Sequence, residues 1–240
     1  MKPRMAKGLA CSLLMLVAAP AWAQKIDRLQ NLAQREFRLL SEDVGGALSY
    51  HQQTPTEPLG LTGFDVGLAL TMAHVRNNDI LKRASSDSVP SYLPVPTLRL
   101  DKGLPLGFDV GVLYAAIPGS DISFWGAQAR YAILQGGIAA PAVGIRASYT
   151  KLRGVDQLDL NTKGLDISAS KGFAMLTPYA GVGRVWVNSE PHAGGLSKET
   201  FGLNKVFVGT GFKLLLFNMN AEVARTGPDT AYSLKAGIRF

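Results

Sequence analysis

Two aspartates stand in the same short motif, and paired carboxylates are residues that could carry acid–base chemistry. Gly63-Phe64-Asp65-Val66-Gly67 recurs as Gly107-Phe108-Asp109-Val110-Gly111. A functional pair is one interpretation. We favour a network of opposite charges inside the fold, because buried charges need partners. Its predicted members are Asp65, Asp109, Arg99, Arg130, Arg146, Lys213, Glu222, Lys235 and Arg239.

The histidines give little support for catalysis or metal binding. The chain has three, His51, His74 and His192. Acyl hydrolases place a serine within reach of a histidine, and Ser197 after His192 does not match that arrangement. No histidine pair has zinc-ligand spacing, and the single cysteine is Cys11. We therefore predict no enzymatic activity and no catalytic, cofactor-binding or metal-binding residue.

The first 23 residues have the pattern of an export signal. Lys2, Arg4 and Lys7 precede an apolar run from 8 to 19, and Ala21 and Ala23 bracket a cleavage site of the A-x-A type. Removing these cations leaves 22 basic against 18 acidic residues, a net charge of +4. So small an excess gives no reason to expect a nucleic-acid partner. No later window reaches the roughly 18 apolar residues of a spanning helix.

Residues 25–40 have helical periodicity, with Leu29, Ala33 and Phe37 on one face. We expect Gly45-Gly46 to end this helix. If the chain that follows closes into a barrel, this helix could plug the barrel mouth or lie on the inner leaflet of a membrane, and we favour the mouth. The predicted domains are a signal peptide over 1–23, a periplasmic helix and plug segment over 24–61, and a β-barrel over 62–240.

From residue 62 onward, apolar residues alternate with small or polar ones, the pattern of strands with two unlike faces. Ten segments show it, with a bulge suspected at Gly164 and an ambiguous facing at Arg184: 64–73, 95–101, 106–115, 125–133, 143–150, 158–170, 176–188, 206–214, 219–224 and 232–240. The long connections 76–92 and 189–199 are both odd-numbered. Since outer-membrane barrels have short periplasmic turns and longer outer loops, both termini would be periplasmic.

The polar face of these strands is rich in glycine and alanine, which suits a narrow interior better than a water-facing surface. The sequence therefore favours an all-β, antiparallel transmembrane barrel of about ten strands with an N-terminal amphipathic helix, its apolar face toward lipid. Aromatic residues would form girdles at the two interfaces. Trp125, Tyr114 and Trp186 would mark the outer one, and Tyr131 and Tyr179 the inner one.

The chain ends in Tyr232, Leu234, Ala236, Ile238 and Phe240 at every second position. This ending resembles the C-terminal signal of Gram-negative outer-membrane β-barrel proteins, and Thr177-Pro178-Tyr179-Ala180-Gly181-Val182-Gly183 is similar to strands of small members. The resemblance implies an outer-membrane location, contact with its lipid, and assembly by the barrel-assembly machinery through the last strand. It leaves the subfamily and the oligomeric state open.

Three functions fit this reading. The first is a structural barrel, or a narrow or gated path for a small or apolar solute, since so narrow a barrel is filled mostly by its own side chains. The second is a barrel enzyme that acts on lipid or peptide. The third is a surface-interaction protein that binds through the loops 76–92 and 188–199.

Overall fold

The computed structural model describes residues 26–85, 91–117, 120–137 and 140–240. The predicted signal peptide and Cys11 lie outside the described residues. The elements in chain order are η1 (Leu29–Asn31), α1 (Gln34–Ala47), β1 (Phe64–His74), α2 (Asn78–Ala84), β2 (Tyr92–Gly103), η2 (Pro105–Gly107), β3 (Phe108–Ala116), β4 (Ser123–Gln135), β5 (Ala142–Arg153), β6 (Leu158–Ser170), β7 (Leu176–Pro191), β8 (Glu199–Leu214), β9 (Phe217–Thr226) and β10 (Asp229–Arg239).

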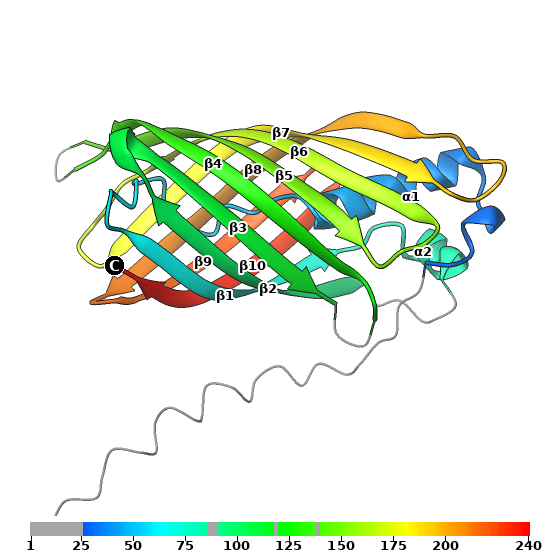
Figure 1. Ribbon diagram of the computed structural model, residues 1–240, viewed down its shortest axis with the longest axis horizontal. Helices are drawn as coiled ribbons and strands as arrows, with labels where there is room; N and C mark the ends of the chain where they lie inside the picture. The colour runs from blue at the N-terminus through cyan, green and yellow to red at the C-terminus, as the bar shows by residue number, and fades with distance from the viewer. Residues whose placement is uncertain (1–25, 86–90, 118–119, 138–139) are drawn as a thin grey trace, which may run out of the picture.

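The ten strands close into one antiparallel barrel (Figure 1). Each strand pairs with its neighbours in sequence, and β1 pairs with β10. At this seam the Phe64 amide donates to the Phe240 carbonyl at 2.7 Å, and the Phe240 amide donates back at 3.0 Å. The predicted fold class is confirmed, and the terminal phenylalanine extends the ladder that closes the barrel.

The barrel has two unlike ends. The C-terminal end, where Phe240 lies, carries the even-numbered connections 104–107, 136–141, 171–175 and 215–216. The opposite end carries the odd-numbered ones, including 75–91 and 192–198, and we call it the helix end because α1 and α2 lie there (Figure 1). The connection 75–91 matches the predicted loop 76–92 in length but contains α2, and the predicted loop 188–199 is reduced to 192–198 because β7 and β8 extend into it.

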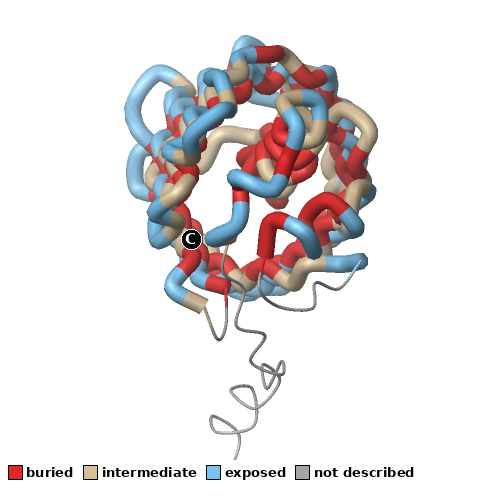
Figure 2. The backbone as a smooth tube through the Cα atoms, turned by 90° about the vertical axis from the view of Figure 1, so that its right-hand side faces the viewer, coloured by how far each residue is buried: buried red, intermediate tan, exposed pale blue. Residues whose placement is uncertain are grey.

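The N-terminal segment runs inside the barrel. Looking into the helix end, Figure 2 shows a buried helix within the ring of strands. Residue 26 pairs with Ser85 beside α2, and the chain then passes through the lumen to β1 at the C-terminal end. The expectation that the helix would share an end with Phe240 is therefore not met. The connections that we assigned to the outer side are the ones that surround it.

The bounds of the helix also differ from the prediction. Residues 29–31 form a short 3-10 turn, and α1 continues through Gly45 and Gly46. A Cβ on Gly45 would lie 2.6 Å from Cγ2 of Val187, and one on Gly46 would lie 3.2 Å from Oδ2 of Asp229. The expectation that these glycines end the helix is therefore wrong. Their lack of a side chain lets the helix lie close to the barrel wall.

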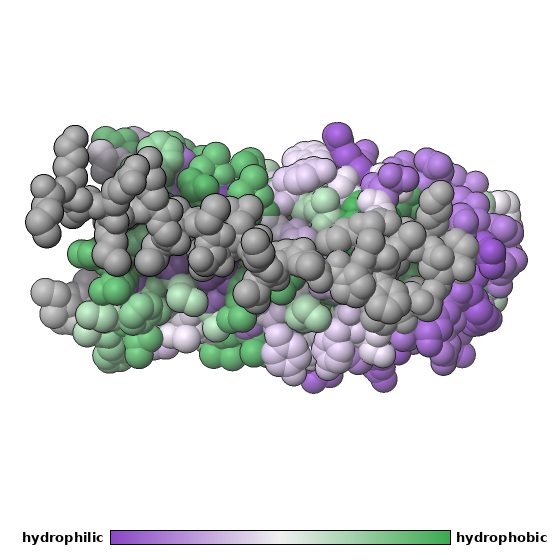
Figure 3. All heavy atoms as spheres, turned by 90° about the horizontal axis from the view of Figure 1, so that it is seen from below, coloured by the Kyte–Doolittle hydropathy of each residue, from purple (hydrophilic) through white to green (hydrophobic). Residues whose placement is uncertain are grey.

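The polarity of the wall inverts along its length. On β7 the outward side chains from the C-terminal end onward are Leu176, Pro178, Ala180 and Val182, then Arg184, Trp186, Asn188 and Glu190. The inward set changes in the opposite sense, from Tyr179 and two glycines to Val185 and Val187. Figure 3 shows hydrophobic residues over one half of the barrel and hydrophilic ones over the other. We call the apolar outward half the belt.

The same inversion explains the suspected bulge at Gly164. On β6, Leu158 and Leu160 face inward near the helix end and Asp166 faces inward within the belt, with no change of phase. The register with β5 also continues through Gly164 opposite Ser148. The predicted bulge is wrong, since the polarity of each face changes there and the facing does not.

Beyond the belt, the barrel interior is an apolar core. Phe37 and Leu40 of α1 are fully buried and pack with Leu81 of α2 and inward residues of the wall. Burying one such side chain contributes about 1.5–3 kcal/mol. Asp43 joins the two helices by accepting hydrogen bonds from the backbone and side-chain amides of Asn77 at 2.8 and 2.9 Å. Burial raises the pKa of the Asp43 carboxyl.

Candidate functional site: the charged lumen and its plug

Residues 48–58, which we call the plug, cross the lumen without regular secondary structure. His51, Gln52, Gln53, Thr54 and Thr56 are all buried. A buried backbone outside helix or sheet needs hydrogen-bond partners from other groups. The barrel wall supplies them.

Cations of the wall donate to the carbonyl oxygens of the plug. The sequence of contacts follows the plug through the lumen: Arg146 and Lys205 to Tyr50, the first at 3.4 Å, Arg99 to His51 at 2.8 Å, Arg130 to Pro55 at 2.9 Å, and Arg239 to Glu57 at 3.2 Å. Hydrogen bonds from charged donors are stronger than neutral ones. The plug backbone is therefore held at several points along its length.

Anions of the wall accept from the same segment. Oε2 of Glu222 accepts the Gln53 amide at 2.7 Å and the Tyr179 hydroxyl at 3.0 Å. Its other oxygen lies 3.5 Å from Nδ1 of His51. Directly after the plug, Oδ1 of Asp109 accepts the Leu59 amide at 3.0 Å. Gln53 has a φ of 51°, so Glu222 fastens the plug at a sharp bend.

The wall charges also pair with one another. Lys235 and Asp65 are 2.6 Å apart, Nε of Arg130 donates to Asp109 at 3.1 Å, and Arg146 pairs with Asp166. Around the plug, the described residues include five buried cations and five buried anions: Arg99, Arg130, Arg146, Lys205, Lys235, Asp65, Asp101, Asp109, Asp166 and Glu222. Two further buried carboxylates, Asp43 and Asp229, lie at the helix end.

The structure places seven of the nine predicted network residues inside the lumen, all but Lys213 and Arg239. Lys213 has the inward phase of β8 but is exposed, because it lies at the strand end beside the barrel mouth. Arg239 is half-buried at the same mouth and holds Glu57. Seven of the predicted residues thus lie together among the luminal charges, whereas Lys213 lies apart from them at the mouth.

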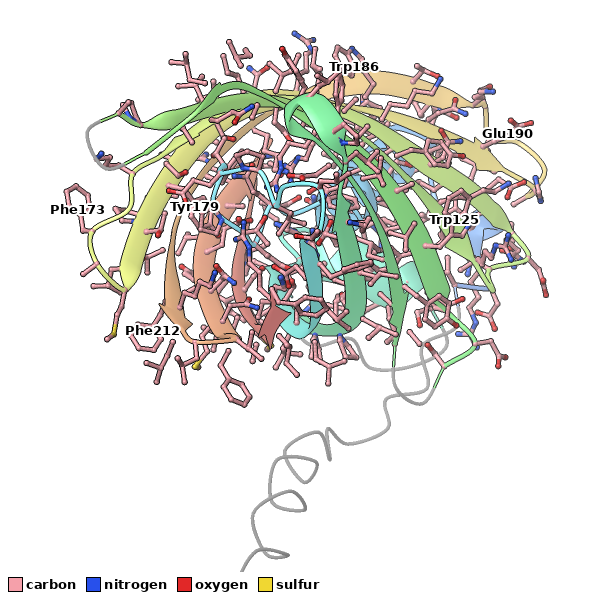
Figure 4. The ribbon with its side chains drawn as sticks, turned by 60° about the vertical axis from the view of Figure 1, so that its left-hand side comes forward. Trp125, Phe173, Tyr179, Trp186, Glu190 and Phe212 are labelled. Atoms are coloured by element: carbon pink, nitrogen blue, oxygen red, sulfur yellow. The ribbon has the colours of Figure 1, made fainter. Side chains whose placement is uncertain are left out.

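Sequence reasoning missed Asp101, Asp166, Lys205 and Tyr179. Tyr179 was expected in the inner girdle, yet it is buried in the lumen. The other predicted girdle residues face outward. Figure 4 shows Trp186 and Glu190 in the half of the barrel away from Phe173 and Phe212, which lie near the C-terminal end.

The histidines occupy three different settings. His51 is in the plug, and His74 stacks on Tyr92 with ring centroids 5.0 Å apart. His192 lies in the β7–β8 connection, where Nδ1 is 3.1 Å from the Asp156 carbonyl and Nε2 is 3.4 Å from Asp159. No serine contact of His192 is observed among the described residues, and the Ser197 amide instead donates to Oε1 of Gln34 at 2.8 Å.

The space around the plug is uneven. A hollow of about 670 Å³ opens at the C-terminal end between residues 57–60, 135–137 and Gly172. Farther inside, the cavity beside Gln53, Thr71 and Arg99 measures about 10 Å³, roughly the room that one water needs. The plug thus narrows the lumen at the level of the Arg99 contacts.

No helix among the described residues is long and apolar enough to cross a membrane. The described residues also contain no group of three or more histidine, cysteine, aspartate or glutamate side chains that could hold a metal ion.

The fold and the site define a plugged β-barrel with a polar lumen and an apolar outer belt, the architecture of membrane-spanning barrels. No protein-family profile and no curated protein sequence matches the chain. Among solved structures, the chain is similar to the N-terminal β-barrel domain of Pseudomonas aeruginosa OprF, with 11% identity, a TM-score of 0.39, and coverage of 75% of this chain and 99% of that one.

Two other solved structures are comparably distant. The KdgM porin has 11% identity and a TM-score of 0.39, covering 73% of this chain and 99% of its own. Omp33 of Acinetobacter baumannii has 10% identity and a TM-score of 0.34, covering 75% of this chain and all of its own, 100%. The assignment of the fold rests on the closed ten-strand barrel of this chain itself.

Proposed function

We propose that this chain is an integral protein of a Gram-negative outer membrane whose barrel is closed by its own N-terminal segment. Export through the predicted signal peptide and assembly through the last strand belong to this proposal. One observation carries it: wall cations hold the plug carbonyls from Tyr50 to Glu57. In this role the barrel does not act as an open pore. It anchors a rigid polar part at the helix end, made of α1 and the ends of β6, β7 and β8 outside the belt, which we call the head.

The head is well suited to a structural or surface role. Outside the belt, β6, β7 and β8 continue as a wall with polar residues outward and an apolar core inward. Glu199 joins this wall to α1 through Arg38 at 3.1 Å and Gln34 at 2.5 Å. The helix is thus part of the folded head, and its release would expose Phe37 and Leu40.

A gated path is the second candidate. It is favoured by the polar character of the plug contacts, because water can replace hydrogen bonds of this kind at modest net cost. The hollow at the C-terminal end would then be its entrance. We propose no enzymatic role, since the exposed His192–Asp159 pair has no nucleophile beside it among the described residues.

Single-channel recording in planar lipid bilayers tests the proposal. We expect the mature chain to be non-conducting and a variant that lacks residues 24–60 to open water-filled channels. A second variant covers the case in which the deletion fails to fold. The hydroxyls of Ser41 on α1 and Ser189 on β7 are 2.8 Å apart, so Ser41→Cys with Ser189→Cys can lock the helix to the wall, and Ser189→Cys alone is the matched control.

The locked variant separates the candidates. Silent recordings in oxidised and reduced forms support a closed barrel. Channels that appear only after reduction support the gated path. Steady channels through the oxidised variant would refute both, because current would then pass a plug that cannot leave.

A further inference from the structure

The outward residues just beyond the belt form a row of cations on one side of the barrel. On β5 to β9 the outward residues of the belt end at Tyr149, Leu165, Val182, Val206 and Val223, with the aromatic Trp186 lying farther along β7. The next outward residue toward the helix end is Lys151, Lys163, Arg184, Asn204 and Arg225, strand by strand. Four of these five boundary positions are cationic, and Asn204 on β8 is the exception. We call Lys151, Lys163, Arg184 and Arg225 the collar.

Strand pairing places the collar residues on neighbouring strands, with one interruption at Asn204 on β8. Lys163 lies opposite Tyr149 on β5 and Trp186 on β7, and Arg184 lies opposite Leu165 on β6 and Asn204 on β8. Neighbouring strands are about 4.8 Å apart. The charges therefore follow one another around the wall at the edge of the belt, with aromatic rings between them.

The collar has no acidic partner in the described part of the chain. None of its side chains forms an ion pair there, and Nε of Arg225 donates to the Gly227 carbonyl at 3.3 Å. Asp159, which faces outward on β6, is four residues beyond Lys163, about 13 Å at some 3.3 Å per residue. It lies beside His192, so the positive charge of the collar is uncompensated.

The guanidinium of Arg184 lies on the outer surface at this edge of the belt, where an anion can reach it. A Cβ on Gly202 would lie 2.6 Å from Nε of Arg184, so the guanidinium lies along the wall over β8. Arginine and lysine are the side chains that bind phosphate oxygens, arginine often through two bonds. Tyrosine and tryptophan favour the headgroup level of a bilayer.

We propose that the collar binds the phosphate groups of a lipid whose acyl chains cover the belt. This inference rests on the proposed outer-membrane location. The phosphate comes from a lipid and not from solution, because the cations border the apolar surface directly. A phosphorylated headgroup neutralises the collar while its chains cover residues such as Leu165 and Val182.

The test measures lipid binding to the full mature chain in detergent by native mass spectrometry, with hexa-acylated lipid A as the probe. The probe carries two phosphates or none. We expect the bisphosphorylated form to bind at least ten-fold more tightly than the dephosphorylated one. The collar variant Lys151→Gln, Lys163→Gln, Arg184→Gln and Arg225→Gln should lose that preference. The matched control, Arg28→Gln, Arg35→Gln, Lys82→Gln and Lys198→Gln, removes the same charge at the helix end and should keep it.

Equal binding of the two lipid forms to the wild-type chain would overturn the proposal, and so would an unchanged preference in the collar variant. The proposal would also be overturned if millimolar inorganic phosphate abolished the preference of the wild-type chain and left no lipid bound. The anion site would then not need a lipid. Insertion into neutral vesicles, read as a heat-modifiable band on gels, tests the outer-membrane proposal separately. A wild-type chain that inserts but ignores phosphate refutes the collar alone.

Discussion

The ion pair between Lys235 and Asp65 fastens the two strands that close the barrel, and its removal is the most direct test of the luminal network. Asp65 belongs to β1 and Lys235 to β10, and both side chains are almost fully buried, with 1% and 0% exposed. A Cβ on Gly67 would lie 2.7 Å from Cε of Lys235. The lysine therefore reaches its partner by passing over that glycine.

Replacing Lys235 with Met should destabilise the folded barrel by about 3–5 kcal/mol, the cost of leaving one member of a buried ion pair alone. Two features place the loss in the upper part of that range. Asp101 lies opposite Asp65 in the register of β1 and β2, and a second carboxylate raises the cost of an unpaired one. Oδ2 of Asp65 also has no hydrogen-bond partner among the described residues.

The measurement is urea unfolding of the mature chain refolded in detergent micelles, followed by the fluorescence of Trp125 and Trp186. With a slope of about 2 kcal/mol per molar, the Lys235→Met midpoint should fall by roughly 1.5–2.5 M. The double variant with Asp65→Asn should recover most of this, because a neutral pair leaves no isolated charge. Lys213→Met, an exposed cation at the same end, should change stability by less than about 0.5 kcal/mol. An unchanged Lys235→Met midpoint, or additive losses in the double variant, would refute the reasoning.

Three further changes probe the helix end. Gly45→Val places a side chain where Cγ2 of Val187 is 2.6 Å away and should cost about 1–3 kcal/mol in the same urea assay, with partial recovery when Val187→Ala is added. Phe37→Ala should cost about 3–5 kcal/mol and speed trypsin cleavage within α1, whereas unchanged cleavage would mean that the helix is not held by its core. Because burial raises the pKa of Asp43, the folded state favours its protonated form, and this penalty on stability grows as the pH rises through that pKa. Asp43→Asn should therefore gain stability relative to wild type between pH 4 and pH 7, and a constant difference would contradict this.

The number of strands could be predicted from the sequence because period-two alternation needs no knowledge of tertiary structure. What failed was the assignment of faces beyond the belt. Asp166 was missed because a suspected bulge at Gly164 hid its inward phase, and Lys205 because the predicted strand began one residue later. Arg184 looked ambiguous since a charge followed apolar residues on one face. All three lie near the height where the outer surface changes from apolar to polar.

The end at which the helix lies could not be predicted, for a related reason. The apolar face of α1 fits either barrel mouth or a membrane surface equally well in sequence. The end of the barrel at which the helix lies depends on the inward residues of the wall. Val185, Val187 and Leu203 can be recognised as the lining of a core once the change of polarity along the wall is known. The alternation pattern alone carries no information on which solvent each face meets.

The N-terminal segment changes its own conformation where the wall changes polarity. A helix satisfies its backbone hydrogen bonds internally, so α1 can pack on the apolar interior near Val187. The plug is irregular and needs outside partners, and it begins where Arg146, Lys205 and Arg99 face inward. A helix continued into the charged part would leave those cations without carbonyl acceptors, and a coil in the apolar part would leave its own backbone unpaired. The luminal charges are therefore explained by the conformation of the segment they hold, without any need for a permeating ion.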